Sequence, residues 1–354
     1  MTLILGNDDV ARLLTMEICI AALEEGYHDL AKGIALTRPR SDCLAPTKRG
    51  DAVYGLKSMD GIVPSAGVGA VRINSDIITW PREQGTLRRV KVPAAPGARY
   101  VGLVLLFSTE NGEPLAIFPD GVLQRLRVGA TNGLGAKYLA RRDCESVALL
   151  GSGWQAGTQL LAICAVRPVK RVRCFSPNPD HRAAFVAEMA PQIAASIEAV
   201  ESPEAAVAGA DVVLCATNAI EPVFFARWIE PGMHLSAIKR PEIEPAAIAR
   251  ADHLFIHTSV STPQQVIAEG LDILPERYTD DREERAFAGL PLLADLIAGG
   301  QPGRRAASEI TCFINNLGMG FQFAAAGAAL YRQALAAGAG HALPTEWFTQ
   351  DVHP

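Results

Sequence analysis

The pattern of apolar and polar residues divides the chain into a first part that favours strands and a second part in which strands and helices alternate. An amphipathic run through Leu13, Leu14, Ile18 and Leu23 follows the acidic start GNDD and predicts one helix that ends near Gly33. The segments VYGLKSM, VGAVRINSD and RYVGLVLLF are rich in residues that favour strands. An Asn-Gly pair in STENGEPLAIF adds a hairpin turn between two apolar runs. This part predicts an antiparallel or mixed sheet.

From residue 120 onwards the pattern becomes a regular alternation. The apolar runs SVALLG, RVRCF, DVVLCAT, MHLSAI and HLFIHT predict strands, and WQAGTQLLAICAV, DHRAAFVAEMA, EPAAIARA and TPQQVIAEG predict helices. Such alternation is typical of parallel βαβ units in a doubly wound sheet. Residues 308–338 predict one long, alanine-rich helix that is interrupted around Gly318 and Gly320.

Length and composition set the scale of the molecule. A chain of 354 residues favours two domains, and a composition of 49% hydrophobic and 20% charged residues is that of a globular protein with ample core. The net charge of −5 argues against a general nucleic-acid binder. The sequence shows neither a signal-peptide pattern nor a run of about 18 apolar residues, so we expect a cytoplasmic protein that does not enter a membrane.

Neither the cysteines nor the histidines form a reactive motif. The seven cysteines never occur in Cys-x-x-Cys spacing, so we interpret them as small buried residues in a reducing compartment. His253 and His257 have no third ligand at metal spacing, and we predict no metal site. No Gly-x-Ser-x-Gly segment supports a serine hydrolase.

The segment LLGSGWQAGTQL joins a predicted strand to a predicted helix through the pattern Gly-x-Gly-x-x-Ala. Gly151 permits the tight turn, Gly153 lets the backbone approach a pyrophosphate, and Ala156 lets the helix pack closely on the strand. The helix then offers free N–H groups and its positive dipole end to the phosphates. A turn without a ligand is the alternative, but the flanking strand and helix are the context that a dinucleotide site requires.

The residues after the next predicted strand bear on the choice between NAD and NADP. An acidic residue there would hold the ribose hydroxyls, and this sequence has Ser176 instead. Ser176, Asn178 and Arg182 could meet a 2′-phosphate, which slightly favours NADP. Asp180 in the same loop could reach the ribose, which keeps NAD open.

Polar residues also follow a later predicted strand. The run CATN ends with Thr217 and Asn218, where a doubly wound sheet opens toward its ligand crevice. A hydroxyl and an amide at this place suit the ribose or the nicotinamide of a dinucleotide. Capping of a following helix is the alternative role for both residues.

Four segments form one ordered pattern along most of the chain: RPR, GLKSM, NGEPLAIFPDGVLQRLRVGATNGLGAKYLARRD and LLGSGWQAGTQLLA. This pattern resembles the ornithine cyclodeaminase/mu-crystallin family. Gln155 after the second glycine and the AKYLAR helix upstream carry the resemblance more specifically than the glycines do. The resemblance implies a homodimer. Each subunit would have a Rossmann domain (126–319) with a doubly wound parallel sheet, inserted into a mixed α/β substrate-binding and dimerisation domain (1–125 plus 320–354).

Carried over by position, the resemblance assigns the carboxylate of the substrate to Arg40 in RPR, Lys57 in GLKSM and Arg127 in LRVGA. An Arg grips a carboxylate with two parallel hydrogen bonds, and a Lys supplies a point charge. Arg72 in VRINSD is a further substrate-binding candidate. Without the resemblance, Lys57 could be a strand residue that faces solvent, and Arg127 a surface residue of a helix.

Lys57 and Arg127 are the predicted catalytic residues. Lys57 could relay a proton, because nearby arginines would disfavour its charged form and lower its pKa. Where family members carry a loop with a catalytic aspartate, this chain reads SAIKRPEIEP, with Lys239 and Arg240 near that place. This departure argues against ornithine cyclisation, and the added charge suits a substrate with a second acidic group. A solvated loop is the alternative.

The start of the last helix, FINNLGMGFQF, also departs from the family pattern. Asn315, Asn316 and Gly318 would approach the nicotinamide carboxamide, or would only pack at the domain junction. The predicted cofactor-binding residues are Gly151, Gly153, Trp154, Gln155, Ala156, Ser176, Asn178, Arg182, Ala216, Thr217, Asn218 and Asn316.

Together these residues predict an NAD(P)-dependent reductase or dehydrogenase of small amino and imino acids. Hydride would pass between the nicotinamide and a carbon of a C=N or C–N bond. One alternative is ornithine cyclodeamination to proline and ammonia with a recycled dinucleotide. The other is a non-enzymatic protein that binds NADP as a stabiliser, as lens crystallins do.

Overall fold

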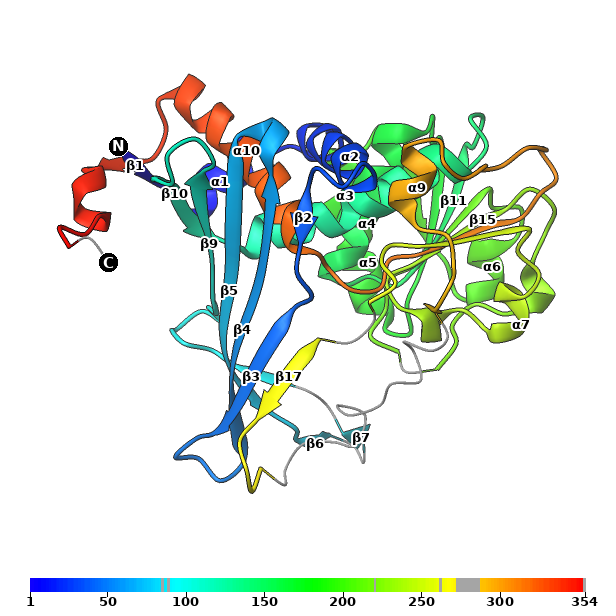
Figure 1. Cartoon of the computed structure of the whole chain (residues 1–354). Helices are drawn as coiled ribbons and strands as arrows, with labels where there is room; N and C mark the ends of the chain where they lie inside the picture. The colour runs from blue at the N-terminus through cyan, green and yellow to red at the C-terminus, as the bar shows by residue number, and fades with distance from the viewer. Residues whose placement is uncertain (84–85, 88–89, 220, 261–262, 272–286, 353–354) are drawn as a thin grey trace.

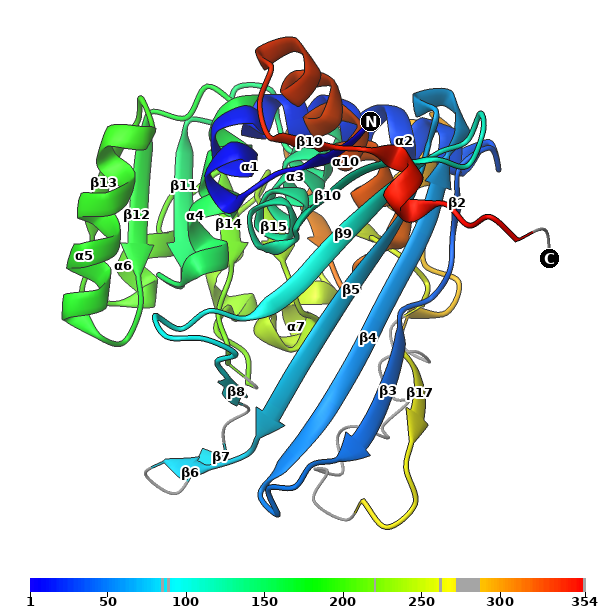
Figure 2. The same ribbon diagram turned by 90° about the vertical axis from the view of Figure 1, so that its left-hand side faces the viewer.

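Two large β-sheets stand side by side in the computed structural model, and a group of helices joins them (Figure 1). The structure describes residues 1–83, 86–87, 90–219, 221–260, 263–271 and 287–352. Figure 2 shows the long strands of one sheet on one side of the molecule and the second sheet on the other. The predicted fold class, α/β with a doubly wound parallel sheet beside a mixed sheet, is confirmed.

The mixed sheet has ten strands in the described part of the chain. Their order is β17 (Gln264–Ile267), β3 (Ser41–Pro46), β4 (Ala52–Val63), β5 (Val68–Thr79), β9 (Val101–Ser108), β10 (Pro114–Pro119), β1 (Thr2–Ile4) and β19 (His341–Leu343), while β2 (Leu36–Thr37) pairs with β4 and β8 (Val90–Val92) pairs with β5. All pairs are antiparallel except β1 with β10 and β17 with β3. Buried residues alternate with partly exposed ones along β5, because one face of the sheet covers the core.

The parallel sheet has seven strands among the described residues, and all its pairings are parallel. The strands lie in the order β13 (Ser196–Ala199), β12 (Arg171–Phe175), β11 (Ser146–Leu150), β14 (Val212–Cys215), β15 (His234–Ala237), β18 (Thr311–Ile314) and β16 (His253–Ile256). The chain reverses its direction of winding between β11 and β14. This is the switch point at which doubly wound sheets bind their ligands. A separate ribbon pairs β6 (Arg82–Glu83) with β7 (Thr86–Leu87).

The described helices are α1 (Asn7–Leu13), α2 (Met16–Ala31), α3 (Gly121–Leu139), α4 (Trp154–Val166), α5 (Pro179–Met189), α6 (Pro203–Val207), α7 (Pro245–Ile248), α9 (Leu293–Ile297) and α10 (Gly320–Ala337). Helices α2, α3 and α10 lie between the two sheets (Figure 1). Their side chains join one hydrophobic core with residues of both sheets, such as Leu106 of β9 and Phe313 of β18. None of the described helices is both long and apolar enough to cross a membrane.

The start of α10 rests directly on the backbone of β4. A Cβ added to Gly61 would collide with the backbone of Phe321, and one added to Gly320 would collide with the backbone of Asp60. Glycine at both positions therefore allows a helix end and a strand to touch without side chains between them. This contact fixes the residues of the first turn of α10 over the inner face of the mixed sheet.

One predicted N-terminal helix is two helices in the structure. Helix α1 ends at Leu13, and Thr15 begins α2 by accepting a hydrogen bond on Oγ1 from the backbone N–H of Ile18. A threonine N-cap needs an extended backbone, which interrupts the helical run. The continuous apolar pattern hid this break, because the buried Leu14 lies between the two helices.

Two other predicted helices are wrong in part. The segment TPQQVIAEG contains strand β17, and its predicted start at residue 262 lies outside the described residues. Residues 311–314, expected in the long last helix, form β18, and the helix begins only at Gly320. Four-residue runs are too short for their periodicity to separate strand from helix. EPAAIARA forms only the single turn α7.

The proposed division into 126–319 and the two flanking segments stays a prediction. One strand departs from it, because β17 falls within 126–319 and pairs with β3 of the mixed sheet. The two sheets are therefore linked by the chain at more places than the division implies.

Candidate functional site

The loop between β11 and α4 has the geometry that the glycine pattern predicts. Gly151 has a φ of +120°, and a Cβ there would collide with the carbonyl oxygen of Ala216. A Cβ on Gly153 would meet no described atom within 4 Å, so space beside this residue is open. No described side chain caps α4, and the N–H groups of Trp154 and Gln155 at its start can meet an anion.

Trp154 and Arg125 form the rim of this loop. Trp154 is 56% exposed, and the guanidinium of Arg125, from α3, lies 5.3 Å from the centre of its ring. The Nε atom of Arg125 is buried and has no hydrogen-bond partner in the described part of the chain. Sequence reasoning missed Arg125, whose only signal is its position two residues before Arg127. Behind the rim, Gln155 accepts a hydrogen bond from Thr158 on its backbone carbonyl.

The side chain of Ala156 is fully buried and belongs to the core between α4 and the parallel sheet. The loop therefore combines an open glycine at its tip with a tightly packed alanine one turn later. That combination is the one a pyrophosphate site needs.

A buried carboxylate joins the loops that follow β14 and β15. Glu242 is fully buried and accepts from the Oγ1 of Thr217 at 2.7 Å, from the N–H of the same residue, and from the N–H of Lys239 at 3.2 Å. Burial raises the pKa of Glu242, while the hydrogen bonds from Thr217 and the charge of Lys239 oppose that rise. The Nζ of Lys239 donates to the carbonyl oxygen of Ala219 at 3.0 Å. Glu242 thus joins Thr217 to Lys239, and Asn218, the residue after Thr217, is exposed.

The side chain of Asn316 makes hydrogen bonds to the backbone of the loop after β16. Its amide oxygen accepts from the N–H of Thr258 at 3.2 Å, and its amide nitrogen donates to the carbonyls of Thr258 at 2.9 Å and Val260 at 3.3 Å. The neighbouring Asn315 donates to the carbonyl of Val128 on α3 at 3.1 Å. These bonds fix the loop after β18 at the carboxyl edge of the parallel sheet.

The polar residues after β12 make hydrogen bonds and an ion pair with other groups of the protein. The hydroxyl of Ser176 lies 2.7 Å from that of Ser152 in the glycine loop, which brings the two loops together. Asn178 caps α5 by accepting from the N–H groups of the first turn. Arg182 is buried, donates to the carbonyl of Ser176 at 2.7 Å and pairs with Glu201 at 2.9 Å. The structure therefore gives Asn178 and Arg182 partners within the protein.

The cations predicted on the first strands lie on the inner face of the mixed sheet, and each has a carboxylate partner. Arg40 makes two hydrogen bonds of 2.8 Å to the carboxylate of Asp42. Lys57, the register partner of Asp42, is 6% exposed and donates to Asp76 at 3.1 Å. Lys91 lies 2.8 Å from the other oxygen of Asp76. Burial raises the pKa of Asp76, but the hydrogen bonds and charges of Lys91 and Lys57 outweigh burial and lower it.

Arg72 is also paired. Its guanidinium contacts Asp120 at 2.6 Å and donates to the amide oxygen of Asn74. A Cβ on Gly102 would collide with both Asp120 and Asn74, so this glycine lets the carboxylate reach the sheet. Arg40, Lys57 and Arg72 are thus each paired with a carboxylate, and the expected effect of nearby arginines on Lys57 stays a prediction.

Arg127 differs from these cations. It is 4% exposed, and its Nη1 and Nε donate to the amide oxygens of Gln322 at 3.1 Å and Gln124 at 3.3 Å. No carboxylate of the described residues pairs with it. Burial, and then the charge of Arg72, lower the pKa of Arg127 to about 9. Its guanidinium lies so close to Gly318 that a Cβ there would meet Nη1 at 2.5 Å.

The ring of Phe323 lies near both arginines, with its centre 5.6 Å from the guanidinium of Arg72 and 5.5 Å from that of Arg127. Arg127 also touches Gly318 in the loop that leaves the carboxyl end of β18. It therefore stands between the cations of the mixed sheet and the crevice of the parallel sheet. Among the described residues, no contact brings Lys239 to this group of cations.

Sequence reasoning found the cations but missed their carboxylates. Asp42, Asp76 and Asp120 are all buried. The period of two along β5 was the available signal, because it places Arg72, Asn74 and Asp76 on one face. Gln322 and Phe323 lie in the apolar start of the last helix, where the sequence gives no signal of a site.

A glycine loop of this geometry on a doubly wound sheet, with a buried cation at the edge of its crevice, defines a class of dinucleotide-binding α/β proteins. The family model of the ornithine cyclodeaminase/mu-crystallin family matches residues 95–338, and the chain belongs to this family. The resemblance inferred from the sequence is confirmed.

Related proteins agree with this assignment. The Δ1-pyrroline-2-carboxylate reductase of Bacillus cereus is 29% identical over 251 residues, covering 68% of this chain and 73% of that protein. The iminosuccinate reductase of Paracoccus denitrificans is 26% identical over 329 residues, covering 90% and 92%. The structure of the Δ1-pyrroline-2-carboxylate reductase of Thermococcus litoralis in complex with NADH and L-proline superposes with a TM-score of 0.76 at 25% identity, covering 97% of this chain and 100% of that chain.

Proposed function

We propose that this protein is an NAD(P)-dependent oxidoreductase that acts on the C–N bond of a small amino or imino acid. One observation carries the proposal: Arg127, a buried cation without a described carboxylate partner, lies beside the edge of the sheet on which the open glycine loop stands. A buried charge of this kind is costly unless a ligand of opposite charge meets it. Relatives that reduce Δ1-pyrroline-2-carboxylate and iminosuccinate, both carboxylates, support this assignment.

In this proposal each cation has a distinct task. Arg127 binds the carboxylate of the substrate, and the first turn of α4 binds the pyrophosphate of the dinucleotide. The dinucleotide supplies the hydride chemistry when it is bound. Reduction of a C=N bond leaves a nitrogen that needs a proton, and in this proposal Lys57, which lies against Asp76, donates it. Arg40 and Arg72 shape the site through their ion pairs with Asp42 and Asp120.

For the dinucleotide we propose NAD or NADP without the slight preference for NADP. That preference depended on Asn178 and Arg182, which already have partners in the protein. The neighbouring structure with bound NADH supports the use of NADH. Binding of NADH and NADPH, measured side by side by fluorescence, decides between them.

The decisive experiment is a substrate panel with each reduced dinucleotide. We expect net oxidation of NADH or NADPH with Δ1-pyrroline-2-carboxylate or with a keto acid plus ammonia. Proline formation from ornithine without net change in the dinucleotide would indicate cyclodeamination instead. Retained NADH binding without turnover of any substrate would indicate a binding protein.

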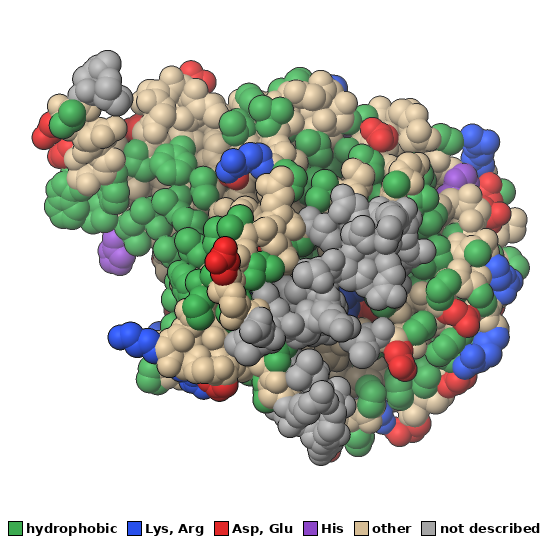
Figure 3. All heavy atoms as spheres, turned by 60° about the horizontal axis from the view of Figure 1, so that its bottom comes forward, with side chains coloured by type: hydrophobic (Ala, Val, Ile, Leu, Met, Phe, Trp, Pro, Cys, Tyr) green, Lys and Arg blue, Asp and Glu red, His purple; other side chains and the backbone are tan. Residues whose placement is uncertain are grey.

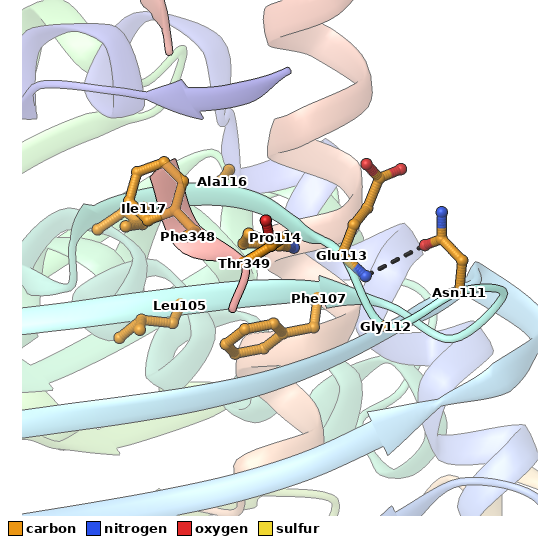
Figure 4. A pocket seen from close by; sticks show the side chains of 10 residues that line it. All are labelled: Leu105, Phe107, Asn111, Gly112, Glu113, Pro114, Ala116, Ile117, Phe348 and Thr349. Carbon is orange, nitrogen blue, oxygen red and sulfur yellow. Dashed lines mark hydrogen bonds between the residues drawn. The ribbon is translucent and has the colours of Figure 1, made fainter. Parts of the chain in front are cut away.

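We also propose a homodimer that forms through the outer face of the mixed sheet. Leu56, Val101 and Leu103 on this face are 43%, 42% and 39% exposed. Figure 3 shows hydrophobic side chains gathered on the side of the molecule that the mixed sheet forms. A groove of about 400 Å³ opens beside β9 and β10, and Figure 4 shows Phe348 of the C-terminal segment lying across it. Contiguous apolar surface of this kind is typical of subunit contacts.

The dimer is tested by charge insertion on that face. L103D should give a monomer in sedimentation, at a concentration where the wild type is a dimer, because an aspartate on this face would be buried without a partner in the dimer. L335D is the matched control, since Leu335 is 55% exposed on α10. A wild-type monomer, or a dimeric L103D, would contradict this proposal.

The proposed location is the cytoplasm. All seven cysteines are free thiols, and five of them are buried. Burial raises the pKa of Cys19 to about 12, so this thiol is unreactive. A set of free thiols suits a reducing compartment.

A further inference from the structure

We infer that Gln322 is a positioning residue that aims Arg127 at the carboxylate of the substrate while leaving the charge of the arginine unneutralised. The inference depends on the proposed function, because it concerns the same carboxylate. It adds a residue that the sequence motifs do not single out.

The side chain of Gln322 makes four hydrogen bonds in a fully buried place. Its Oε1 accepts from Nη1 of Arg127 at 3.1 Å and from the backbone N–H of Met319 at 3.1 Å. Its Nε2 donates to the Oγ1 of Thr131 at 2.7 Å and to the hydroxyl of Tyr27 at 3.2 Å. The network joins α2, α3 and α10.

The direction of this amide is fixed by its neighbours. The hydroxyl of Thr131 donates to the carbonyl oxygen of Arg127 at 2.8 Å, so it faces Gln322 with its lone pairs. Rotating the amide by half a turn would place its NH2 group against Nη1 of Arg127 and against the N–H of Met319. Two donors would then face donors, which a buried site does not tolerate. The carbonyl oxygen of Gln322 therefore always points at Arg127.

An amide oxygen orients a guanidinium without cancelling its charge. Phe323 follows Gln322 in the chain and covers the guanidinium with an apolar ring 5.5 Å away, again without adding a negative charge. Among the described residues, Nη2 of Arg127 has no hydrogen-bond partner. Arg127 is thus held by neutral groups on several sides and keeps donors for an anion from outside the protein.

The rest of the network is neutral as well. Burial raises the pKa of Tyr27, and the hydrogen bond to Thr131 opposes this only in part. Neither Tyr27 nor Thr131 carries a charge near neutral pH. Within this network Arg127 is therefore the one charged group, and Gln322 determines where that charge lies.

The test replaces the amide by a carboxylate of the same size. In Q322E an anion stands where Oε1 now accepts from Arg127, and it should occupy the arginine in place of the substrate. We expect the KM for Δ1-pyrroline-2-carboxylate to rise about tenfold or more, while kcat and the Kd for NADH stay within about threefold. The KM should fall again at lower pH, where the new glutamate takes up a proton.

A second pair of variants avoids any new charge. T131V removes the hydroxyl that fixes the amide, and it should raise the KM by about threefold or more with little effect on kcat. T131S, which restores the hydroxyl, should return the KM to the wild-type value. A role in packing alone would leave serine no better than valine, and that result would overturn the inference.

The outcomes separate this inference from the proposed function. A folded Q322E with normal NADH binding and a KM within about twofold of wild type overturns the inference. Wild type that binds NADH but turns over no imino acid overturns the function, and calorimetry with pyrrole-2-carboxylate then replaces kinetics. Weaker binding of pyrrole-2-carboxylate to Q322E than to wild type supports the inference. Equal affinity for the two proteins, or no binding to wild type, overturns it. If Q322E fails to fold, the Thr131 pair gives the result.

Discussion

Replacement of Arg127 with methionine should separate binding from stability. Burial and the charge of Arg72 lower the pKa of Arg127 from 12.5 to about 9, which at ~1.4 kcal/mol for each pH unit is a cost of about 5 kcal/mol for burying this charge. Methionine removes that cost. It also takes away the donor of the Gln124 oxygen and one of the two donors of the Gln322 oxygen, which keeps the N–H of Met319, at ~1–3 kcal/mol for each lost bond.

These contributions nearly cancel. We expect the free energy of unfolding of R127M to lie within about 2 kcal/mol of the wild-type value. Removal of one partner of a matched buried ion pair costs more, about 3–5 kcal/mol. Urea denaturation measures the difference. A loss above about 4 kcal/mol would refute the idea that this arginine lacks a counter-charge in the protein.

The same reasoning predicts the pH dependence. The folded pKa of about 9 lies below the unfolded value of 12.5, so the charged form is destabilised in the folded protein. The penalty is complete below about pH 9 and is relieved as the pH rises toward 12.5. The wild type should therefore gain stability relative to R127M above pH 9, and an unchanged difference would count against the argument.

R127M should weaken substrate binding strongly, although it changes the stability of the protein little. Charge-assisted hydrogen bonds contribute ~1.5–3 kcal/mol each, so loss of two should lower kcat/KM by about 100-fold or more. The Kd for NADH should not change, because the glycine loop is untouched. Steady-state kinetics with Δ1-pyrroline-2-carboxylate, beside fluorescence titration of NADH, gives both numbers, and an unchanged kcat/KM would refute the role in substrate binding.

Three further predictions concern other residues. G151A should abolish NADH binding in a fluorescence titration, because a φ of +120° strains alanine and its Cβ collides with the next loop; normal affinity would contradict the proposed loop geometry. Burial and then the charge of Arg127 lower the pKa of His257 to about 3. As the pH falls from 7 to 5, the free energy of unfolding of the wild type, measured by urea denaturation, should therefore decrease by about 2 kcal/mol more than that of H257F. Equal decreases would contradict this prediction. D76N should lower the free energy of unfolding by about 3 kcal/mol, because Lys57 and Lys91 lose their shared carboxylate. Urea denaturation measures this difference, and an unchanged stability would show that the pairing is unimportant.

The doubly wound sheet could be predicted because its strands are buried on both faces. Strands β11, β14 and β15 read as short apolar runs, each followed by a turn, and that pattern is local. Strands β17 and β18 could not be predicted in the same way. Pairing with distant segments, such as β17 with β3, decides their conformation.

The candidate site shows the same limit. The glycine loop could be predicted, because Gly151 and Gly153 encode a local backbone shape. The carboxylates could not, because Lys57 meets Asp76 only through the register of β4 with β5, and Arg72 meets Asp120 across 48 positions. Sequence patterns therefore indicated where positive charge gathers, but not that Arg127, unlike Arg40, Lys57 and Arg72, lacks a described carboxylate.

The pairing of β17 with β3 has a consequence for synthesis of the chain. Strand β3 leaves the ribosome roughly 220 residues before the segment that covers its edge, so during translation it has an exposed, unsatisfied backbone. An uncovered strand edge can recruit other nascent chains. Expression at high rates should therefore favour aggregation of incomplete chains, and a chaperone that shields extended segments should increase the yield of the folded protein.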